Sequence, residues 1–280
     1  MIPRSIKELL PPGITVMAHW MPWFGTSSHM DIGYDCTNPL VIVRTVARMK
    51  EIGIDCVVPD WYGQDNTHHD QASLMMLAEC EKQGLTFALC LDAGAIKGKA
   101  DPQAEFVREL SYASLKYYPS SSYLKHNGRP LILFFGDSSY PTVNWNTVRN
   151  SIADNPQFIF RNRIGFLHAQ SDGAFSWIGL SSDPNNPGLS MLNAFYTEAA
   201  KFPKKIAIGS IYPGFDDSNA SWGQGRKMNR RAGQTFYDTC SIVPVTGVPY
   251  IQIVTFNDHE ESSGIEFSIT DNIFRYFPNK

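Results

Sequence analysis

The feature that most limits the fold is a repeated alternation between short apolar segments and longer segments with helical periodicity. Most of the short segments are apolar on both faces, as expected for parallel strands covered by helices. Eight of them are predicted strands: Ile14–Ala18, Ile54–Pro59, Thr86–Leu91, Pro130–Phe135, Ile164–Leu167, Ala174–Trp177, Ile206–Ile211 and Tyr250–Thr255. The amphipathic segments between them are predicted helices: Asn38–Ile52, His69–Gln83, Pro102–Tyr117, Trp145–Ala153, Leu189–Phe202 and Lys227–Cys240.

Eight strand–helix units in 280 residues predict a (β/α)8 TIM barrel formed by a single domain, residues 1–280. The link between the fifth and sixth predicted strands is too short for a helix, so we expect the barrel to be slightly degenerate there. A doubly wound sheet is the alternative, but its GxGxxG fingerprint is missing. The segment Gly94–Lys99 is not a phosphate-binding loop, because Ala100 stands where such a loop has a magnesium-binding hydroxyl.

Composition excludes several classes of protein. The formal net charge is −3, with 24 Lys and Arg against 27 Asp and Glu, so no overall positive field attracts nucleic acid. No apolar run approaches the roughly 18 residues of a membrane span, and the N-terminus lacks the apolar run of a signal peptide. The five cysteines show no CxxC spacing. We therefore expect neither a nucleic-acid nor a membrane partner, no cofactor and no metal, and a monomer.

Polar and aromatic residues follow most of the predicted strands. In a barrel, the loops after the strands converge on one mouth and carry the chemistry. The residues at these strand ends include His19, Trp20 and Trp23 after the first strand, Asp60 and Trp61 after the second, Asp92 after the third, His168 and Gln170 after the fifth, Trp177 after the sixth, and Tyr212, Asp216, Asp217 and Trp222 after the seventh. Aromatic rings beside carboxylates suit sugars, whose apolar faces stack on rings while their hydroxyls bond to charged groups. A single Asp after a strand is also a common helix cap.

The segment after the eighth strand is the strongest candidate for catalysis. The apolar run Tyr250–Thr255 leads directly into Asn257, Asp258, His259, Glu260 and Glu261. Hydrolysis of a glycosidic bond needs one group that protonates the leaving oxygen and a second that activates a nucleophile or stabilises the oxocarbenium ion. Two carboxylates in different environments divide these roles through different pKa values. Asp258 and Glu261 are therefore the predicted catalytic pair.

This segment resembles the terminal-strand motif of glycoside hydrolase families 71 and 99, in which WNDYxE or WNEWxE precedes a turn of small residues. The similarity continues along the chain in HWMPWFG (His19–Gly25), VVPDWYG (Val57–Gly63), FALCLDAG (Phe87–Gly94), RPLILFFG (Arg129–Gly136), GAFSW (Gly173–Trp177), YPGFDDSNASWGQGR (Tyr212–Arg226) and the RRAGQTF that follows it. The resemblance covers most of the chain in the right order. It implies a (β/α)8 barrel and endo-acting cleavage of an α-linked polysaccharide, α-1,3-glucan or α-mannan.

Carried over by position, Asp258 takes the acidic place after Asn257, and Glu261 takes the second acidic place. The resemblance also makes Arg226, in the matched loop, a candidate substrate contact. The chain departs from the families at Phe256, where they have Trp, and at His259, where they have an aromatic residue. These departures bear on the linkage more than on the reaction. In family 99 the first carboxylate is thought to deprotonate the 2-hydroxyl of the sugar, and spacing does not decide whether that applies here.

Two other functions compete with this hypothesis. One is a non-catalytic sugar-binding barrel, which retains a polymer without cleaving it. The other is a metal-dependent hydrolase that uses the run His68, His69 and Asp70 with Asp65 or His19 as ligands. The family resemblance further suggests a secreted protein, although this chain shows no signal peptide.

Overall fold

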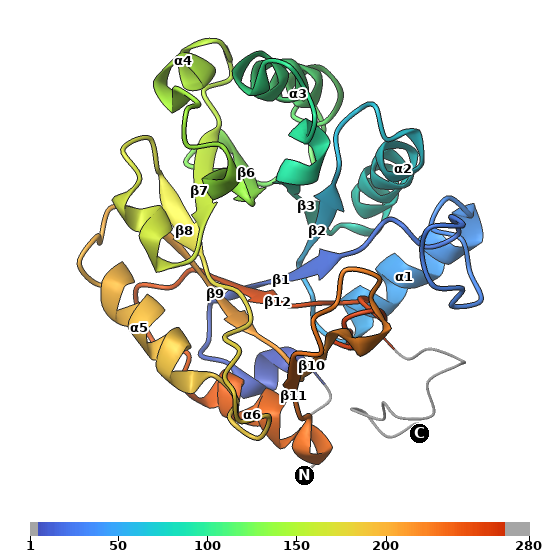
Figure 1. Cartoon of the computed structure of the whole chain (residues 1–280), viewed down its shortest axis with the longest axis vertical. Helices are drawn as coiled ribbons and strands as arrows, with labels where there is room; N and C mark the ends of the chain where they lie inside the picture. The colour runs from blue at the N-terminus through green and yellow to red at the C-terminus, as the bar shows by residue number, and fades with distance from the viewer. Residues whose placement is uncertain (1–4, 267–280) are drawn as a thin grey trace.

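In the computed structural model, which describes residues 5–266, eight parallel strand positions close into a barrel surrounded by helices (Figure 1). Closure is made by β1, which pairs with β2 on one side and with β12 on the other. The predicted (β/α)8 fold is thus confirmed. The assignment of residues 1–280 to a single domain stays a prediction, and residues 1–4 and 267–280 lie outside the described part.

The third strand position is divided into two short strands that both pair with β2. The barrel strands are β1 (Thr15–Trp20), β2 (Cys56–Trp61), β3 (Thr86–Phe87), β4 (Leu89–Asp92), β6 (Arg129–Phe135), β7 (Gln157–Arg161), β8 (Gly173–Phe175), β9 (Ile206–Ile211) and β12 (Tyr250–Ile253). The helices are α1 (Pro39–Glu51), α2 (Thr67–Gln83), α3 (Pro102–Lys116), α4 (Trp145–Asn150), α5 (Leu189–Ala199) and α6 (Gln234–Ser241). Short antiparallel pairs join β5 (Lys125–His126) to β6, and β10 (Phe215–Asp216) to β11 (Lys227–Met228).

The barrel strands are apolar on both faces because each face is buried in a different core. Side chains alternate across a strand, so every second residue points into the barrel. The barrel interior is filled by one cluster of buried residues: Met17, Cys56, Val58, Ala88, Cys90, Leu131, Leu133, Ile159, Phe175, Ile206, Ile208 and Tyr250. A second, larger cluster fills the space between the strands and the helices. This alternation decides which residues at the strand ends face inward.

Helix boundaries follow local capping chemistry. Asn38 caps α1 by accepting a hydrogen bond from the Leu40 N–H, and Pro39 occupies the first turn as predicted. Helix α2 begins at Thr67, two residues before the predicted start, because the Asn66 side chain accepts a hydrogen bond from the His69 N–H. The same helix ends at Gly84, whose φ of 79° is in the left-handed region that favours glycine.

Two predicted elements are wrong. The predicted fifth strand, Ile164–Leu167, lies in a 3-10 helix (Arg163–Leu167). The strand is instead β7, Gln157–Arg161, which ends where Asn162 turns the backbone to a φ of 64°. His168 and Gln170 therefore do not end a strand. The barrel is nevertheless degenerate where expected, because this 3-10 helix is the only helical element between β7 and β8 in the described chain.

The predicted helix Lys227–Cys240 begins only at Gln234. Its first residues form β11, in which Lys227 pairs across to Asp216 with a 2.9 Å ion pair. Arg231 and Ala232 then have φ values of 50° and 53°, which a right-handed helix cannot contain. Helical periodicity in this segment is therefore overridden by pairing with β10.

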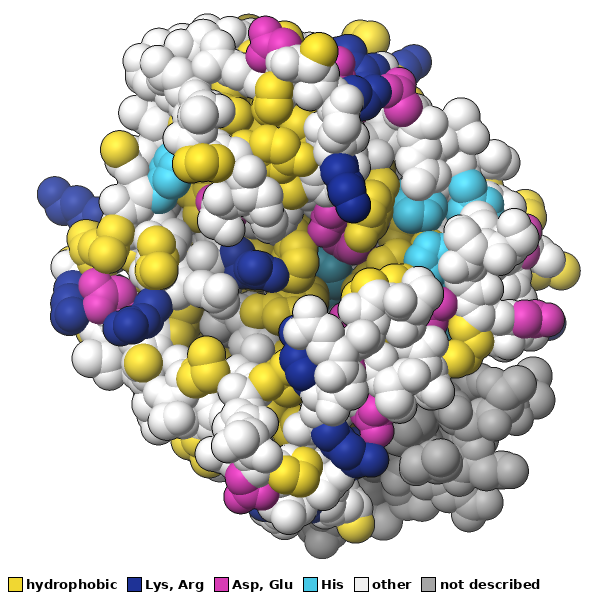
Figure 2. Space-filling model, viewed as in Figure 1, with side chains coloured by type: hydrophobic (Ala, Val, Ile, Leu, Met, Phe, Trp, Pro, Cys, Tyr) yellow, Lys and Arg dark blue, Asp and Glu magenta, His cyan; other side chains and the backbone are white. Residues whose placement is uncertain are grey.

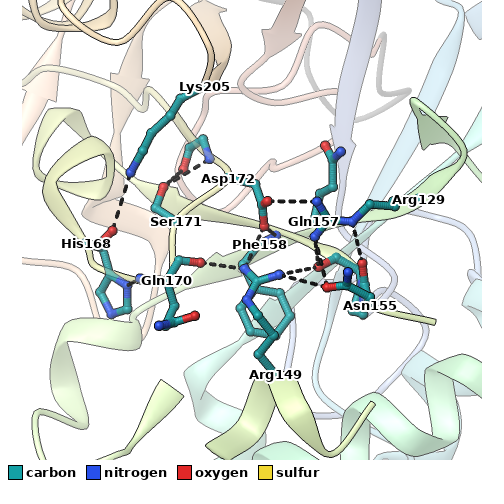
Figure 3. Close-up of polar contacts among 12 residues, drawn as sticks. Arg129, Arg149, Asn155, Gln157, Phe158, His168, Gln170, Ser171, Asp172 and Lys205 are labelled. Carbon is teal, nitrogen blue, oxygen red and sulfur yellow. Dashed lines mark hydrogen bonds and ion pairs between the residues drawn. The ribbon is translucent and has the colours of Figure 1, made fainter. Parts of the chain in front are cut away.

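A polar network joins the N-terminal ends of β6, β7 and β8, on the degenerate side of the barrel (Figure 3). Asp172, just before β8, lies between Arg129 at 3.1 Å and Arg149 at 2.6 Å, and it also accepts a hydrogen bond from the Phe158 N–H. The Arg149 guanidinium stacks over the Phe158 ring at 4.2 Å. We infer that this network holds β6, β7 and β8 together at the place where the barrel has a 3-10 helix instead of a full α-helix.

Candidate active site

A cavity of about 1130 Å³ opens at the carboxyl ends of the barrel strands. Figure 2 shows it as a hollow at the centre of the face, with hydrophobic, acidic and histidine side chains inside. Its position agrees with the rule that barrel loops after the strands form the functional face.

The floor of the cavity continues the inward-facing alternation of the barrel core. Each floor residue stands two positions beyond a residue of the interior cluster, and so it points the same way. These floor residues are His19, Asp60, Asp92, Phe135, Arg161 and Trp177. The structure therefore brings together four residues predicted for substrate binding, from four different strand ends.

The same alternation turns Trp20 and Trp61 away from the cavity. Each follows an inward-facing residue by one position, so its ring lies in the outer core. The Trp61 indole donates a 3.0 Å hydrogen bond to Asp70 and stacks on Tyr112, with ring centroids 6.1 Å apart. The prediction that these two tryptophans contact substrate is therefore not supported by their position.

Four further residues that were predicted to bind substrate do not line the cavity: Tyr212, Asp216, Asp217 and Asn257. Tyr212 is buried, and its hydroxyl donates a hydrogen bond to the Pro187 carbonyl. Asp216 pairs with Lys227. Asp217 is fully buried and accepts hydrogen bonds from the backbone N–H and the Nε of Arg226, both at 2.7 Å. Arg226 itself lines the cavity, so Asp217 positions it.

Asn257 connects the loop after β12 to the loop after β1 through hydrogen bonds. Its side-chain oxygen accepts a 2.7 Å hydrogen bond from the Met21 N–H, and its amide donates to the Met21 carbonyl. The neighbouring Asp258 is thereby held at a fixed place. Asn257 acts through this connection, not as a lining residue.

The acidic run after β12 separates into two kinds of residue. Glu260 points away to the loop after β1, where its carboxylate contacts His29 Nδ1 at 2.8 Å and accepts a hydrogen bond from the Met30 N–H. Asp258 and Glu261 face the cavity. The Glu261 N–H donates to Asp258 Oδ1 at 2.8 Å, so the two carboxylates share one tight turn.

Burial sets the electrostatics of this pair. Asp258 is fully buried, and burial followed by the charge of Glu261 holds its pKa well above the usual range. Its Oδ2 atom has no hydrogen-bond partner within residues 5–266. Burial also raises the pKa of Glu261, although a 3.1 Å hydrogen bond from Trp222 Nε1 and the charge of Arg226 oppose that rise. Two carboxyl groups with raised pKa values in different surroundings can divide the roles of proton donor and proton acceptor.

Two carboxylates on the cavity floor, Asp60 and Asp92, also have raised pKa values. Burial raises the pKa of Asp60 to about 7, and burial with the charge of Asp60 raises that of Asp92 to about 7. Burial lowers the pKa of His19 to about 3, which keeps the imidazole neutral. His19, Asp60 and Asp92 therefore present hydrogen-bonding groups that are largely uncharged below neutral pH, beside the charged guanidinium of Arg161.

Aromatic rings form the rim on the side of Asp258 and Glu261. Trp23 stacks on His29 with centroids 4.6 Å apart, and Trp222 packs edge-on against Trp23 at 5.7 Å. All three line the cavity. Trp222 is 42% exposed, which leaves part of its ring available to a ligand.

Sequence reasoning missed Arg161 and Phe135 as lining residues. Arg161 ends β7, the strand that was assigned to the wrong segment, and its guanidinium lies 4.1 Å from the centre of the Phe135 ring. The usable signal was the short apolar run Phe158–Phe160, preceded by the turn-forming Asn155 and Pro156. Tyr62, an aromatic residue at the predicted end of the second strand, lines the cavity as well, beside Gly94, where an added Cβ would lie 2.6 Å from the Tyr62 ring.

The residues of the metal-site hypothesis do not converge. Asp70 accepts hydrogen bonds from Trp61, Tyr112 and Tyr117 in the core, and Asp65 pairs with Lys99 and Arg108 at the surface. No group of three or more His, Cys, Asp or Glu side chains that could hold a metal was found in the described residues.

No helix within residues 5–266 is both long and apolar enough to span a bilayer.

A scan of protein-family models and a search of curated proteins both found no match to this chain. Solved structures do match. The GH99 endo-alpha-mannosidase from Bacteroides thetaiotaomicron in complex with bis-tris-propane superposes with a TM-score of 0.73 at 17% identity, covering 91% of this chain and 88% of that one. A second structure of a GH99 endo-alpha-mannosidase from this organism gives 0.73 at 16% identity, with the same coverage. A glycoside hydrolase-like protein gives 0.64 at 12% identity, covering 91% and 87%.

At these identities the comparisons establish the fold: the chain is a (β/α)8 barrel like that of family 99. The similarity to family 71 is not tested by these structures and stays a prediction. What the barrel does is argued next from its own residues.

Proposed function

We propose that this protein is a glycoside hydrolase that cleaves internal α-linkages of a polysaccharide of the α-1,3-glucan or α-mannan type. The observation that carries the proposal is the pair of buried Asp258 and half-buried Glu261, which faces a large cavity lined by aromatic rings. The similarity in fold to endo-alpha-mannosidases supports the same reaction class.

In the proposed reaction, Glu261 is the general acid and Asp258 the base. One Glu261 oxygen accepts the Trp222 indole N–H, which leaves the other oxygen to carry the proton for the leaving group. Asp258 Oδ2, which has no partner among the described residues, is placed to accept a proton from the attacking group. Whether that group is water or a hydroxyl of the sugar determines the anomeric outcome.

The remaining cavity residues take binding roles in this proposal. Trp23, Trp177 and Trp222 offer apolar surfaces to sugar rings, and Arg226 reaches the cavity beside Glu261. His19, Asp60 and Asp92 offer hydrogen bonds on the floor. Such a mixture of rings and polar groups suits a neutral sugar.

The test is incubation with a panel of α-glucans and α-mannans, followed by reducing-end analysis and assignment of the product anomer by NMR. We expect shortened oligosaccharides from at least one α-linked polymer and none from the Glu261→Gln variant. Retention of a polymer on the protein without cleavage would instead identify a non-catalytic binding barrel. Activity that is lost on extensive chelation would point to a metal-dependent hydrolase.

A further inference from the structure

The floor of the cavity contains a donor and an acceptor that face each other without bonding. Gln252 Nε2 lies 3.0 Å from His19 Nδ1, and an amide nitrogen can only donate, so Nδ1 accepts and the ring proton is on Nε2. His19 Nε2 lies 3.6 Å from Asp60 Oδ1. That separation is too long for a hydrogen bond between the two atoms.

Asp60 is unusual for a buried carboxyl group. It is 5% exposed, it lines the cavity, and its Oδ1 has no hydrogen-bond partner in the part of the chain that the structure describes. Leaving such an atom unpartnered is costly. A ligand hydroxyl satisfies both sides, because one oxygen can accept from an N–H and donate to a carboxylate.

We propose that His19 and Asp60 jointly bind one hydroxyl of a sugar unit on the cavity floor, with His19 donating to the hydroxyl oxygen and the hydroxyl donating to Asp60. Asp92, on the next strand of the barrel, takes a neighbouring hydroxyl of the same sugar. This inference rests on the proposed function and deepens it, since it assigns the residues that select the sugar.

The aromatic rings beside His19 suit the apolar face of a sugar ring. The Trp177 ring lies 4.8 Å from the His19 ring and 4.8 Å from the Phe135 ring, measured between centroids. Together they make an apolar wall beside the polar groups. On this geometry the site binds a sugar with two adjacent free hydroxyls. Because its polar groups would stay unpaired, it rejects an analogue that lacks one of them.

The test is steady-state kinetics of Asp60→Asn on the polymer that the wild-type protein cleaves. We expect KM to rise at least tenfold, while kcat changes by less than about threefold, because Asp258 and Glu261 keep their positions and the charge of Asp60 is the smallest of the causes that raise their pKa values. The control is Glu51→Gln, the same change of a carboxylate to an amide at an exposed ion pair with Arg48. Circular dichroism melts confirm that each variant is folded.

A double variant separates ligand binding from a structural effect. If His19 and Asp60 hold the same hydroxyl, then His19→Ala with Asp60→Asn raises KM no further than the worse single variant. The monodeoxy methyl glycosides of the cleaved sugar, used as inhibitors, supply the second measurement. One of them should inhibit the wild type at least tenfold more weakly than the parent glycoside, yet inhibit Asp60→Asn as well as the parent does.

The outcomes distinguish the two proposals. Cleavage of a polymer with an unchanged KM for Asp60→Asn, or with additive effects in the double variant, would overturn the hydroxyl site and leave the proposed function standing. If the wild-type protein cleaves nothing in the panel, both proposals fail together.

Discussion

Carboxylates with restricted exposure to solvent lie at both ends of the barrel, half-buried at one end and buried at the other, in opposite surroundings. At the N-terminal end, Asp172 lies between Arg129 and Arg149 and accepts a backbone N–H as well (Figure 3). At the C-terminal end, Asp60 and Asp258 are buried with an oxygen that has no partner within residues 5–266. The Asp172 network joins β6, β7 and β8, whereas Asp60 lies at the carboxyl end of β2 and Asp258 follows β12, so the two arrangements belong to different parts of the same barrel.

The acids at the two ends of the barrel have opposite effects on the stability of the fold. A paired and hydrogen-bonded carboxylate contributes to folding, whereas an unpaired buried one opposes it and persists where function requires it. The predictions below test this contrast, beginning with the largest expected effect.

Removing the proposed catalytic groups should abolish activity without weakening the fold. For Glu261→Gln and Asp258→Asn we expect turnover to fall by about 10²- to 10⁴-fold, the range for general acid–base groups. Tm should be equal or higher, because each amide keeps the shape of the acid and replaces a group whose charged form is disfavoured by burial. Reducing-sugar assays and thermal melts measure the two effects. Near-normal hydrolysis by both variants would refute the assignment.

Removing Asp172, the paired acid, should lower the stability of the protein and leave its activity nearly unchanged. Asp172→Ala leaves two arginines without their partner and the Phe158 N–H without its acceptor. Because the acid is 23% exposed at its side chain, the penalty is smaller than for a fully buried pair. We expect a loss of about 2–4 kcal/mol in the free energy of unfolding. Urea titration measures it, and specific activity at 20–25 °C should be nearly unchanged. A loss below about 0.5 kcal/mol would show that the network is not structural.

Removing the unpaired floor acid should stabilise the protein. The pKa of Asp60 is raised to about 7 from an ordinary 3.8, so the folded state binds the extra proton between about pH 4 and 7. The stability that this proton supplies is complete below about pH 4 and is lost as the pH rises to 7. Asp60→Asn should therefore raise Tm at pH 8 by about 3 °C, and by less at pH 4. An equal shift at both pH values would exclude titration of Asp60 as the cause.

The smallest effect is expected for Trp222→Phe. This change keeps an aromatic ring but removes the hydrogen bond to Glu261 Oε1, which opposes the rise in that residue's pKa. The alkaline limb of the pH–rate profile should move to higher pH, because the acid keeps its proton longer. One such hydrogen bond contributes about 1 kcal/mol, so kcat should fall about fivefold. An unmoved alkaline limb would separate Glu261 from the role of general acid.

Much of the fold was predictable because the signals are local. The apolar runs at Ile14–Ala18 and Ile206–Ile211 can be recognised without knowing their neighbours, and Asn38 marks a helix start by its own side chain. The strand Gln157–Arg161 was missed because a second apolar run, Ile164–Leu167, follows it within three residues. Only pairing with β6 and β8 selects the first of these over the second.

The candidate site was predictable by location more than by residue. Asp258 and Glu261 were identified from the acidic run, and the cavity brings them together. Trp20 and Trp61 were grouped with His19 and Asp60 because adjacent residues at a strand end look equivalent in a sequence.

By itself, the sequence determined the number of strand–helix units, most of their boundaries, and the concentration of acids and rings at the strand ends, since each depends on short-range periodicity and capping. Only the tertiary structure decided which side chains share the cavity. Closing the barrel sets the register of each strand, and one residue of register separates the inward-facing His19 from the outward-facing Trp20. The pairing of Asp172 and the lack of a hydrogen-bond partner for Asp60 Oδ1 have the same origin, because the groups around each acid come from segments far apart in the chain.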